Sequence, residues 1–201
     1  METWTERLFP ATAMPDRDWW QALWPDPGAI ARSLGMEAGM NVIDLGCGDG
    51  YFTAAIARRV RTGKVVGIDL DPALLNEAKA ACAGLENCEL QLGDVMELGA
   101  MNLPAADYVL IANTFHGVPD KTALAREVAK CLRSGGRFAI VNWYPIPREQ
   151  TRVLGQLRGP RTELRMSVEQ TEHVVEPAGF TSEKLVKLPP YHYGAVARKL
   201  A

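Results

Sequence analysis

Short apolar runs recur along the chain, and within each run the apolar residues follow one another with little alternation. Such runs are typical of strands that are buried on both faces of a parallel sheet. The pattern predicts strands at residues 41–45, 65–69, 88–92, 108–111 and 137–143.

Amphipathic segments separate the predicted strands. Phe52, Ile56 and Val60 recur at helical spacing, so they predict a helix with one apolar face after the first strand. Before the fifth strand, Gly135 and Gly136 are expected to end another helix, because glycine is favoured just past a helix C-terminus. Strands and helices therefore alternate through the middle of the chain.

The two ends of the chain depart from this alternation. Residues 1–40 contain a predicted helical segment that Asp16 or Asp18 caps, whereas residues 181–187 and 191–198 predict a terminal pair of strands. The whole pattern predicts an α/β fold, a Rossmann-like three-layer sandwich. Its sheet is expected to be mostly parallel and seven-stranded, with a C-terminal antiparallel strand pair and an N-terminal helical segment.

The composition is that of an ordinary globular protein, with 201 residues of which 47% are hydrophobic and 23% charged. This length predicts a single domain over residues 1–201. The net charge of -2 gives no general attraction to nucleic acid, which is therefore not expected as a partner. The sequence makes no prediction of oligomeric state.

Two further features bear on location and on metals. The N-terminus lacks a basic start with an apolar run after it, and no segment approaches the ~18 apolar residues of a membrane span. A cytoplasmic location without membrane insertion is therefore expected. The four cysteines show no paired CxxC spacing and the three histidines are scattered, so no metal site is expected.

The most informative motif follows the first predicted strand, where Gly46, Gly48 and Gly50 alternate with other residues. Glycine has no Cβ, so such a loop can adopt positive φ and let a ligand lie against bare backbone. The helix that follows points its amide-rich end at the same place. The motif therefore predicts a nucleotide-like ligand at the end of the strand.

Two ligands compete for a loop of this kind, a dinucleotide and an adenosyl compound. The dinucleotide fingerprint places its third glycine where Tyr51 stands, and its loop receives a doubly anionic pyrophosphate. Asp44 and Asp49 would repel a pyrophosphate, whereas they suit the ammonium and sulfonium groups of S-adenosylmethionine. The loop therefore favours S-adenosylmethionine.

Further candidate residues follow the other strands, because ligands bind beyond the carboxyl ends of the strands in an open parallel sheet. Asp69 lies about 20 residues beyond the loop, where an acid can accept both ribose hydroxyls. After the third strand, Asp94 could accept a hydrogen bond from the exocyclic amine of adenine, and Val95 offers its backbone amide. Asn113 and His116 follow the fourth strand, on the side where the reactive group would lie.

These motifs together resemble those of class I S-adenosylmethionine-dependent methyltransferases. The stretch from Phe115-His-Gly-Val-Pro-Asp-Lys to Leu132-Arg-Ser-Gly-Gly-Arg-Phe is most similar to the small-molecule branch, which includes the ubiquinone and menaquinone biosynthesis enzymes. The resemblance covers roughly residues 40–143 and rests on residues 42–50, 65–71, 92–95, 106–113 and 127–143.

The resemblance implies a cofactor-binding core at residues 41–143. Residues 1–40 would form an N-terminal helical cap, and residues 144–201 a connection on the substrate side, a helix and the terminal strand pair. It also implies which residues contact S-adenosylmethionine: Asp44, Gly46, Cys47, Gly48 and Asn113 at the methionine part, Asp69 at the ribose, and Leu70, Asp94 and Val95 at the adenine.

His116 is the candidate general base. The sulfonium methyl is already activated, so a nucleophile needs only to be presented in line at roughly 3 to 3.5 Å. A base is required when the acceptor carries a proton that it will not release unaided. The ordinary pKa of histidine suits that role at neutral pH. The alternative interpretation is a solvated loop histidine.

Candidate acceptor contacts lie on both sides of the core. Trp20 belongs to a tryptophan-rich segment that could form a lid, the alternative being packing of the leading helix. Trp143 and Tyr144 end the fifth strand at the rim. Arg161 is one of several arginines that could bind an anionic acceptor group, or else form a solvated surface with neighbouring glutamates: Arg148, Arg152, Arg158, Arg161 and Arg165.

The sequence thus predicts an enzyme, a methyltransferase that moves the methyl group of S-adenosylmethionine to a small-molecule acceptor by direct in-line displacement. Two alternatives stay open at this stage. One is an NAD-dependent oxidoreductase, and the other is a protein that binds S-adenosylmethionine without turning it over.

Overall fold

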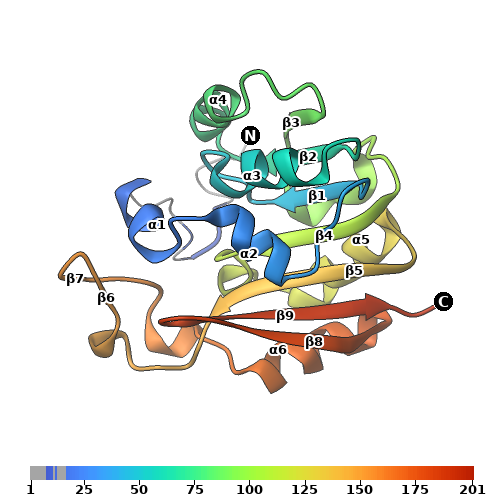
Figure 1. Ribbon diagram of the computed structural model, residues 1–201. Coiled ribbons are helices and arrows are strands. Elements are labelled where there is room, and N and C mark those ends of the chain that lie inside the picture. Colours follow the sequence, from blue (N-terminus) through green and yellow to red (C-terminus); the bar gives the residue numbers. More distant parts are fainter. Residues whose placement is uncertain (1–7, 11, 13–16) are drawn as a thin grey trace, which may run out of the picture.

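Seven strands form one sheet, and its centre is parallel (Figure 1). The computed structural model describes residues 8–10, 12 and 17–201. The strands of this sheet are β1 (Val42–Leu45), β2 (Val65–Asp69), β3 (Cys88–Leu92), β4 (Ala106–Ala112), β5 (Leu132–Trp143), β8 (Phe180–Leu188) and β9 (His192–Lys199). Their order in the sheet is β3-β2-β1-β4-β5-β9-β8, and the last two pairings, β5 with β9 and β9 with β8, are antiparallel.

Helices cover both faces of the sheet, which makes a three-layer sandwich (Figure 1). They are α1 (Arg17–Leu23), α2 (Pro27–Ser33), α3 (Tyr51–Val60), α4 (Pro72–Ala81), α5 (Lys121–Cys131) and α6 (Val168–Val175). Two short 3-10 helices, η2 (Val95–Ala100) and η3 (Phe115–Gly117), follow β3 and β4. This architecture confirms the fold class that the alternation of strands and helices predicted.

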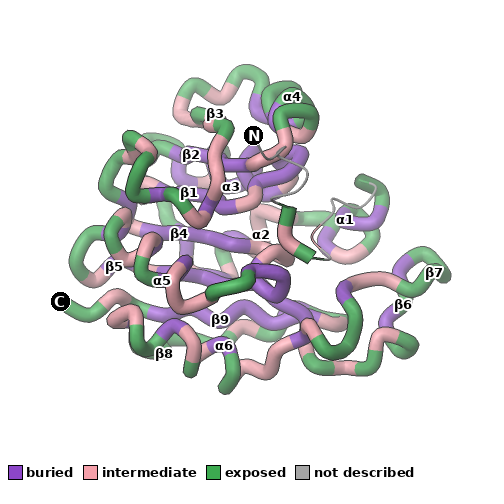
Figure 2. The backbone as a smooth tube through the Cα atoms, turned by 180° about the vertical axis from the view of Figure 1, so that it is seen from behind, coloured by how far each residue is buried: buried purple, intermediate pink, exposed green. Residues whose placement is uncertain are grey.

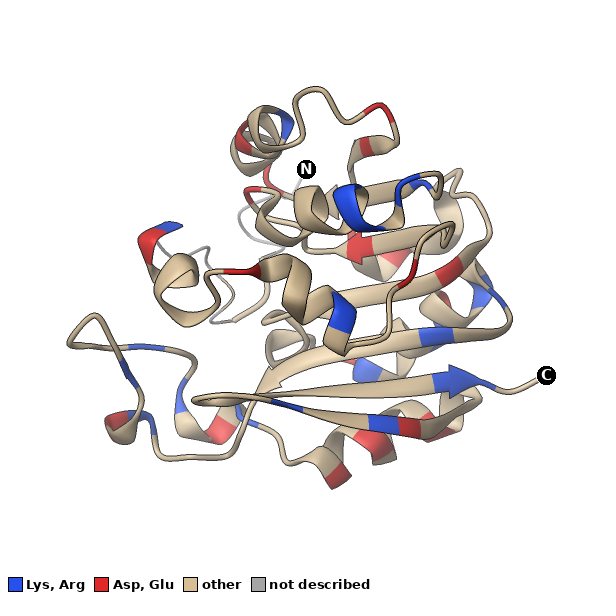
Figure 3. Cartoon of the chain, in the orientation of Figure 1, with Lys and Arg blue, Asp and Glu red and all other residues tan. Residues whose placement is uncertain are grey.

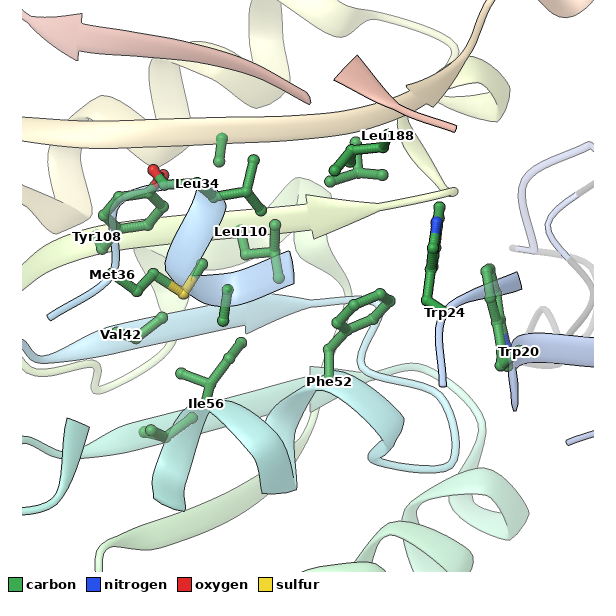
Figure 4. Close-up of a cluster of buried hydrophobic side chains, with 14 of the residues drawn as sticks. Trp20, Trp24, Leu34, Met36, Val42, Phe52, Ile56, Tyr108, Leu110 and Leu188 are labelled. Carbon is green, nitrogen blue, oxygen red and sulfur yellow. The ribbon is translucent and has the colours of Figure 1, made fainter. Parts of the chain in front are cut away.

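Alternate residues of the central strands enter two separate hydrophobic cores. Val42 and Tyr108 pack in the core that contains Ile56 of α3 (Figure 4), whereas Ile43 and Val109 pack in the core on the opposite face. Buried positions accordingly concentrate along these strands (Figure 2). Burial on both faces explains why the strands appear in the sequence as continuous apolar runs.

The order of the strands reverses next to β1. From β1 the chain proceeds outward to β2 and β3, and then it returns to β4 on the other side of β1. The connections that leave β1 and β4 therefore diverge, and a crevice opens between them at the carboxyl ends of the strands. The topology thus positions the glycine loop at the edge of that crevice.

The N-terminal helical segment is present, but one of its two predicted caps, Asp18, is wrong. Helix α1 begins at Arg17, so Asp18 lies in its first turn, and Asp16 lies outside the described residues. Farther along, the buried Tyr108 hydroxyl donates to the carbonyl oxygen of Leu34 at 2.7 Å. This hydrogen bond fastens the segment after α2 to strand β4.

The structure also corrects the boundary before the fifth strand. Helix α5 ends at Cys131, and β5 begins at Leu132, so Gly135 and Gly136 lie within the strand. Leu132 pairs with Ala106, and the register then shifts, so residues 132–136 form an irregular stretch in which Gly135 has a φ of 72°. Glycine allows this bulge in place of a helix terminus.

A short hairpin in the connection after β5 had no counterpart in the predicted elements. Strands β6 (Arg152–Val153) and β7 (Gln156–Leu157) pair antiparallel. Leu154 and Gly155 both adopt positive φ, 52° and 76°, as a two-residue hairpin turn with type I′ geometry requires.

We predict that Tyr108→Phe lowers the free energy of unfolding by about 1–3 kcal/mol, because it leaves the buried Leu34 carbonyl without its donor. Urea denaturation measures the change. The control is Tyr144→Phe, since the Tyr144 hydroxyl has no hydrogen-bond partner within the described part of the chain. Equal stability of the two variants would show that the bond does not fasten the segment.

Candidate functional site

A cavity of about 640 Å³ lies at the carboxyl ends of the parallel strands. Its volume is that of a site for a small organic ligand. The predicted residues that line it come from the ends of β1 and β2, from the segments after β1, β2, β3 and β4, from α1 and from the end of β5: Asp44, Gly46, Cys47, Gly48, Asp69, Leu70, Asp94, Val95, Asn113, His116, Trp20 and Trp143. Residues far apart in the sequence are thus brought to one place.

The glycine loop is held by strand β2. The backbone N–H of Gly48 donates to Oδ2 of Asp69 at 2.8 Å, and the N–H of Cys47 donates to the carbonyl of Ile68 at 3.0 Å. Gly50 has a φ of 79°, and a Cβ on it would lie 3.0 Å from Cα of Ala78 in α4. Glycine at position 50 therefore lets the loop pass close to α4 as α3 begins.

Two buried carboxylates dominate the electrostatics of the cavity. Burial raises the pKa of Asp44 to about 7, and the nearby Asp69 carboxylate contributes to the rise. A hydrogen bond from Thr53 Oγ1 at 2.6 Å acts in the opposite direction and lowers the pKa. Burial also raises the pKa of Asp69, whose carboxylate accepts from the N–H of Asp71 at 2.9 Å as well as from Gly48. A cationic ligand would offset the cost of ionising both groups.

The start of α3 already has an anion of its own. Asp49 is buried, and its carboxylate accepts a hydrogen bond from the N–H of Tyr51 at 3.0 Å. Its Oδ2 atom lies 3.7 Å from Nε of Arg17. The Tyr51 ring stacks near Trp20, and its hydroxyl donates to the carbonyl of Trp24 at 2.6 Å. A pyrophosphate at this helix terminus would be repelled by the Asp49 carboxylate. It would also contact the bulky side chain of Tyr51, at the position where the dinucleotide fingerprint has glycine.

The remaining strand ends complete this half of the cavity. Asp94 caps η2 by accepting from the N–H of Met96 at 2.8 Å, which fixes it beside Val95. Asn113 has a φ of 56°, and both polar atoms of its side chain are buried without a hydrogen-bond partner among residues 8–10, 12 and 17–201. Because Asn113 lines the cavity, its amide is available to a ligand there.

His116 is 3% exposed and lines the cavity from η3. The alternative of a solvated loop histidine is therefore wrong. Gly117, the next residue, packs closely against the N-terminal segment, since a Cβ on it would lie 2.4 Å from the carbonyl oxygen of Pro10. That packing covers η3 and explains the burial.

The tryptophans both pack and line the cavity. Trp19 and Trp20 are 4% and 5% exposed. The Trp19 ring stacks on Trp143 at 6.0 Å between centroids. The two interpretations of this segment, core packing and contact with the acceptor, are therefore compatible.

Two of the residues predicted to contact the acceptor do not line the cavity. The centroid of the Tyr144 ring lies 5.1 Å from that of the Tyr193 ring. The side chain of Arg161 is 81% exposed, and its guanidinium Nη1 lies 4.0 Å from Oε1 of Glu163. Tyr144 follows Trp143 directly, so the two side chains point to different sides of the chain. Arg161 matches the alternative of a solvated surface with a glutamate partner.

Other residues line the cavity although the prediction did not single them out as site residues: Phe9, Trp19, Tyr51, Asp71, Thr114, Arg148 and Arg158. Arg148 and Arg158 belong to the arginine-rich connection, but the sequence gives no signal that separates them from Arg161. The described residues contain no group of three or more His, Cys, Asp or Glu side chains that could hold a metal ion.

The profile of the methyltransferase domain family matches residues 36–184. The chain belongs to the methyltransferase domain family. The match includes every strand end that lines the cavity, and it confirms the resemblance that the motifs of residues 40–143 indicated.

Individual members of the family give the same result. A demethylmenaquinone methyltransferase from Staphylococcus aureus is 35% identical over 108 residues, which cover 53% of this chain and 44% of that relative. The match thus spans less than half the length of that relative. Two solved S-adenosylmethionine-dependent methyltransferases share the fold. The one from Aquifex aeolicus is 25% identical, with a TM-score of 0.77 and coverage of 92% of this chain and 94% of that chain.

The second solved structure, from Mesorhizobium loti, is 22% identical with a TM-score of 0.67, and the coverage is 89% of this chain and 98% of that chain.

In the part of this methyltransferase domain that the structure describes, every helix is too short or too polar to cross a bilayer.

We predict that Asp44→Asn stabilises the unliganded methyltransferase domain at pH 8 by on the order of 2–4 kcal/mol. The folded-state pKa of about 7 lies above that of an unfolded chain, near 4. The contribution of Asp44 to stability is therefore fully present below about pH 4 and is lost as the pH rises through 7.

Urea denaturation of both proteins at pH 5 and pH 8 measures this effect. The increase in the free energy of unfolding of Asp44→Asn over the unaltered protein should be less than about half as large at pH 5 as at pH 8. The exposed Asp18→Asn serves as the control and should leave the pH dependence unchanged. A gain that is the same at both pH values would contradict the assignment to a buried carboxyl.

Proposed function

We propose that this protein is a methyltransferase that transfers the methyl group of S-adenosylmethionine to a small-molecule acceptor. The observation that carries the proposal is the set of buried acids at the glycine loop, which suits a cationic ligand and disfavours a pyrophosphate. Family membership and the names of similar proteins support it.

The cofactor would lie along the ends of β1, β2 and β3. Each carboxylate oxygen of Asp69 has a lone pair beyond the one that a backbone N–H occupies, so Asp69 can accept both ribose hydroxyls. Asp94 and the N–H of Val95 would bind the adenine edge, and Leu70 its face.

The methionine part would lie beside β1 and β4. Asp44, Gly46 and Gly48 line that end of the cavity, and the Asn113 amide can bind the amino or carboxylate group. Burial raises the pKa of Cys47, so this residue contacts the cofactor as a neutral thiol.

The reaction requires mainly positioning. The acceptor forms a bond to the methyl carbon while the bond from that carbon to sulfur breaks, and sulfur keeps the electron pair as S-adenosylhomocysteine leaves. Trp20 and Trp143 bound the acceptor side of the cavity. His116 lies there too, and it would take a proton from an acceptor hydroxyl or acidic carbon.

The same proposal includes one domain over the chain and a cytoplasmic location, with no nucleic acid among its partners; the charge balance supports the last of these. A protein that binds S-adenosylmethionine without turnover is the competing function, and methyl transfer decides between them.

We predict that calorimetric titration shows binding of S-adenosylhomocysteine but not of NADH. Asp69→Asn should lower the affinity for S-adenosylhomocysteine by roughly 10–100-fold, because a charged acceptor for the two ribose hydroxyls is lost. The control, Asp107→Asn, alters a carboxylate that binds the N–H of Asn41 before β1, away from the cavity, and should leave the affinity unchanged. Tighter binding of NADH than of the adenosyl compound would overturn the proposal.

We predict that purified protein moves a labelled methyl group from S-adenosylmethionine to a metabolite of a cell extract. With that acceptor, His116→Asn should lower kcat by roughly 10²–10⁴-fold and remove its dependence on pH near neutrality. An unchanged rate and pH profile would end the role of His116 as base. Absence of any labelled metabolite would favour the non-catalytic binding protein.

A further inference from the structure

The cavity carries opposite charges at its two ends. Among residues 8–10, 12 and 17–201, the carboxylates that line the cavity all belong to the ends of β1, β2 and β3: Asp44, Asp69, Asp71 and Asp94. The cations of the described residues that line it are Arg148 and Arg158, both in the connection between β5 and α6. Figure 3 shows several blue positions along the segment that holds β6 and β7. The second half of the cavity therefore has a positive potential that a cationic methyl donor would not use.

The two guanidinium groups are available to a ligand. Neither forms an ion pair with a carboxylate of the described residues. Arg148 uses its Nε to donate to the carbonyl of Gly159 at 3.1 Å, which leaves its terminal nitrogens for other acceptors. Nε of Arg158 is buried and has no hydrogen-bond partner in the described ranges. A buried donor of this kind requires an acceptor, and a ligand can supply one.

The local fold holds these arginines in place. The buried Arg165 donates to the carbonyl oxygens of Pro160, Ile146 and Arg158 at 2.8 to 3.2 Å, and its guanidinium lies 4.8 Å from the Trp143 ring centroid. Arg165 therefore links separate parts of the connection between β5 and α6 through its buried guanidinium group. The pairing of β6 with β7 and a hydrogen bond from Thr151 Oγ1 to the Arg158 carbonyl at 2.8 Å complete the support.

An aromatic surface lies directly beside the arginines. Gly159 has a φ of 86°, and a Cβ on it would lie 2.8 Å from the Trp143 ring, so the backbone next to Arg158 rests on the indole. The Trp19 ring stacks on that of Trp143, with 16° between their planes, so the two indoles form one aromatic pair beside the arginines. The indole N–H groups of Trp19 and Trp20 are buried without acceptors among the described residues. The surface suits a flat ring that carries oxygen acceptors.

We infer that the acceptor is a planar aromatic carboxylate, bound with its ring along Trp19 and Trp143 and its carboxylate at Arg148 and Arg158. The inference rests on the proposed function and names its substrate class. Guanidinium groups match a carboxylate in shape and charge. A phosphate monoester carries about twice the negative charge at neutral pH, and the four carboxylates in the same cavity disfavour it.

The test uses hydroxybenzoate and hydroxynaphthoate, each paired with its neutral carboxamide, and measures binding by calorimetry to protein saturated with S-adenosylhomocysteine. At least one carboxylate should bind about tenfold or more tightly than its carboxamide. Arg148→Gln and Arg158→Gln should each remove most of that preference and leave the affinity for S-adenosylhomocysteine within about twofold, which also shows that the variants are folded. Arg161→Gln, outside the cavity, should keep the preference.

Equal binding of carboxylate and carboxamide, a preference that survives in both arginine variants, or no binding of any carboxylate would overturn the inference. In each case an intact affinity for S-adenosylhomocysteine would leave the proposed function standing. Loss of that affinity in the unaltered protein would instead contradict the proposed function, so the two failures are distinguishable.

Discussion

The hydrogen bond from the Gly48 N–H to the Asp69 carboxylate is the contact on which the site depends most. It joins the loop after β1 to the end of β2, two segments that only the parallel pairing of those strands brings together. Gly48 donates this bond from a backbone with a φ of 55°, which glycine adopts without strain, and Asp69 supplies the acceptor. The bond leaves part of that carboxylate for a ligand, and so the fold and the proposed cofactor site share one group.

This arrangement has a cost for the unliganded protein. Asp44 and Asp69 are nearly fully buried within electrostatic reach of each other, and burial raises the pKa of both. A fold selected for stability alone would place apolar residues there. The cost becomes reasonable if a cation occupies the cavity during function, since it offsets the repulsion that the two carboxylates impose on the empty site.

Much of the architecture could be predicted because it depends on local signals. Buried strands appear as apolar runs, and Gly48 and Asp69 stand at strand ends that the topology brings together. The start of β5 could not be predicted, since Gly135 serves equally well in a helix terminus and in a bulge, and pairing with β4 decides between them. The same holds for the arginines. Arg148 and Arg161 look alike in sequence, and only long-range packing against Trp143 and Arg165 separates the one that lines the cavity from the one in solvent.

A crystal structure with S-adenosylhomocysteine would show whether the buried acids form the cofactor site. We expect the ribose hydroxyls on the Asp69 carboxylate, the adenine edge at Asp94 and Val95, and the amino group beside Asp44. Density for the ligand at any other place, or a ligand that contacts neither the Asp44 nor the Asp69 carboxylate, would show that these acids do not bind the cofactor.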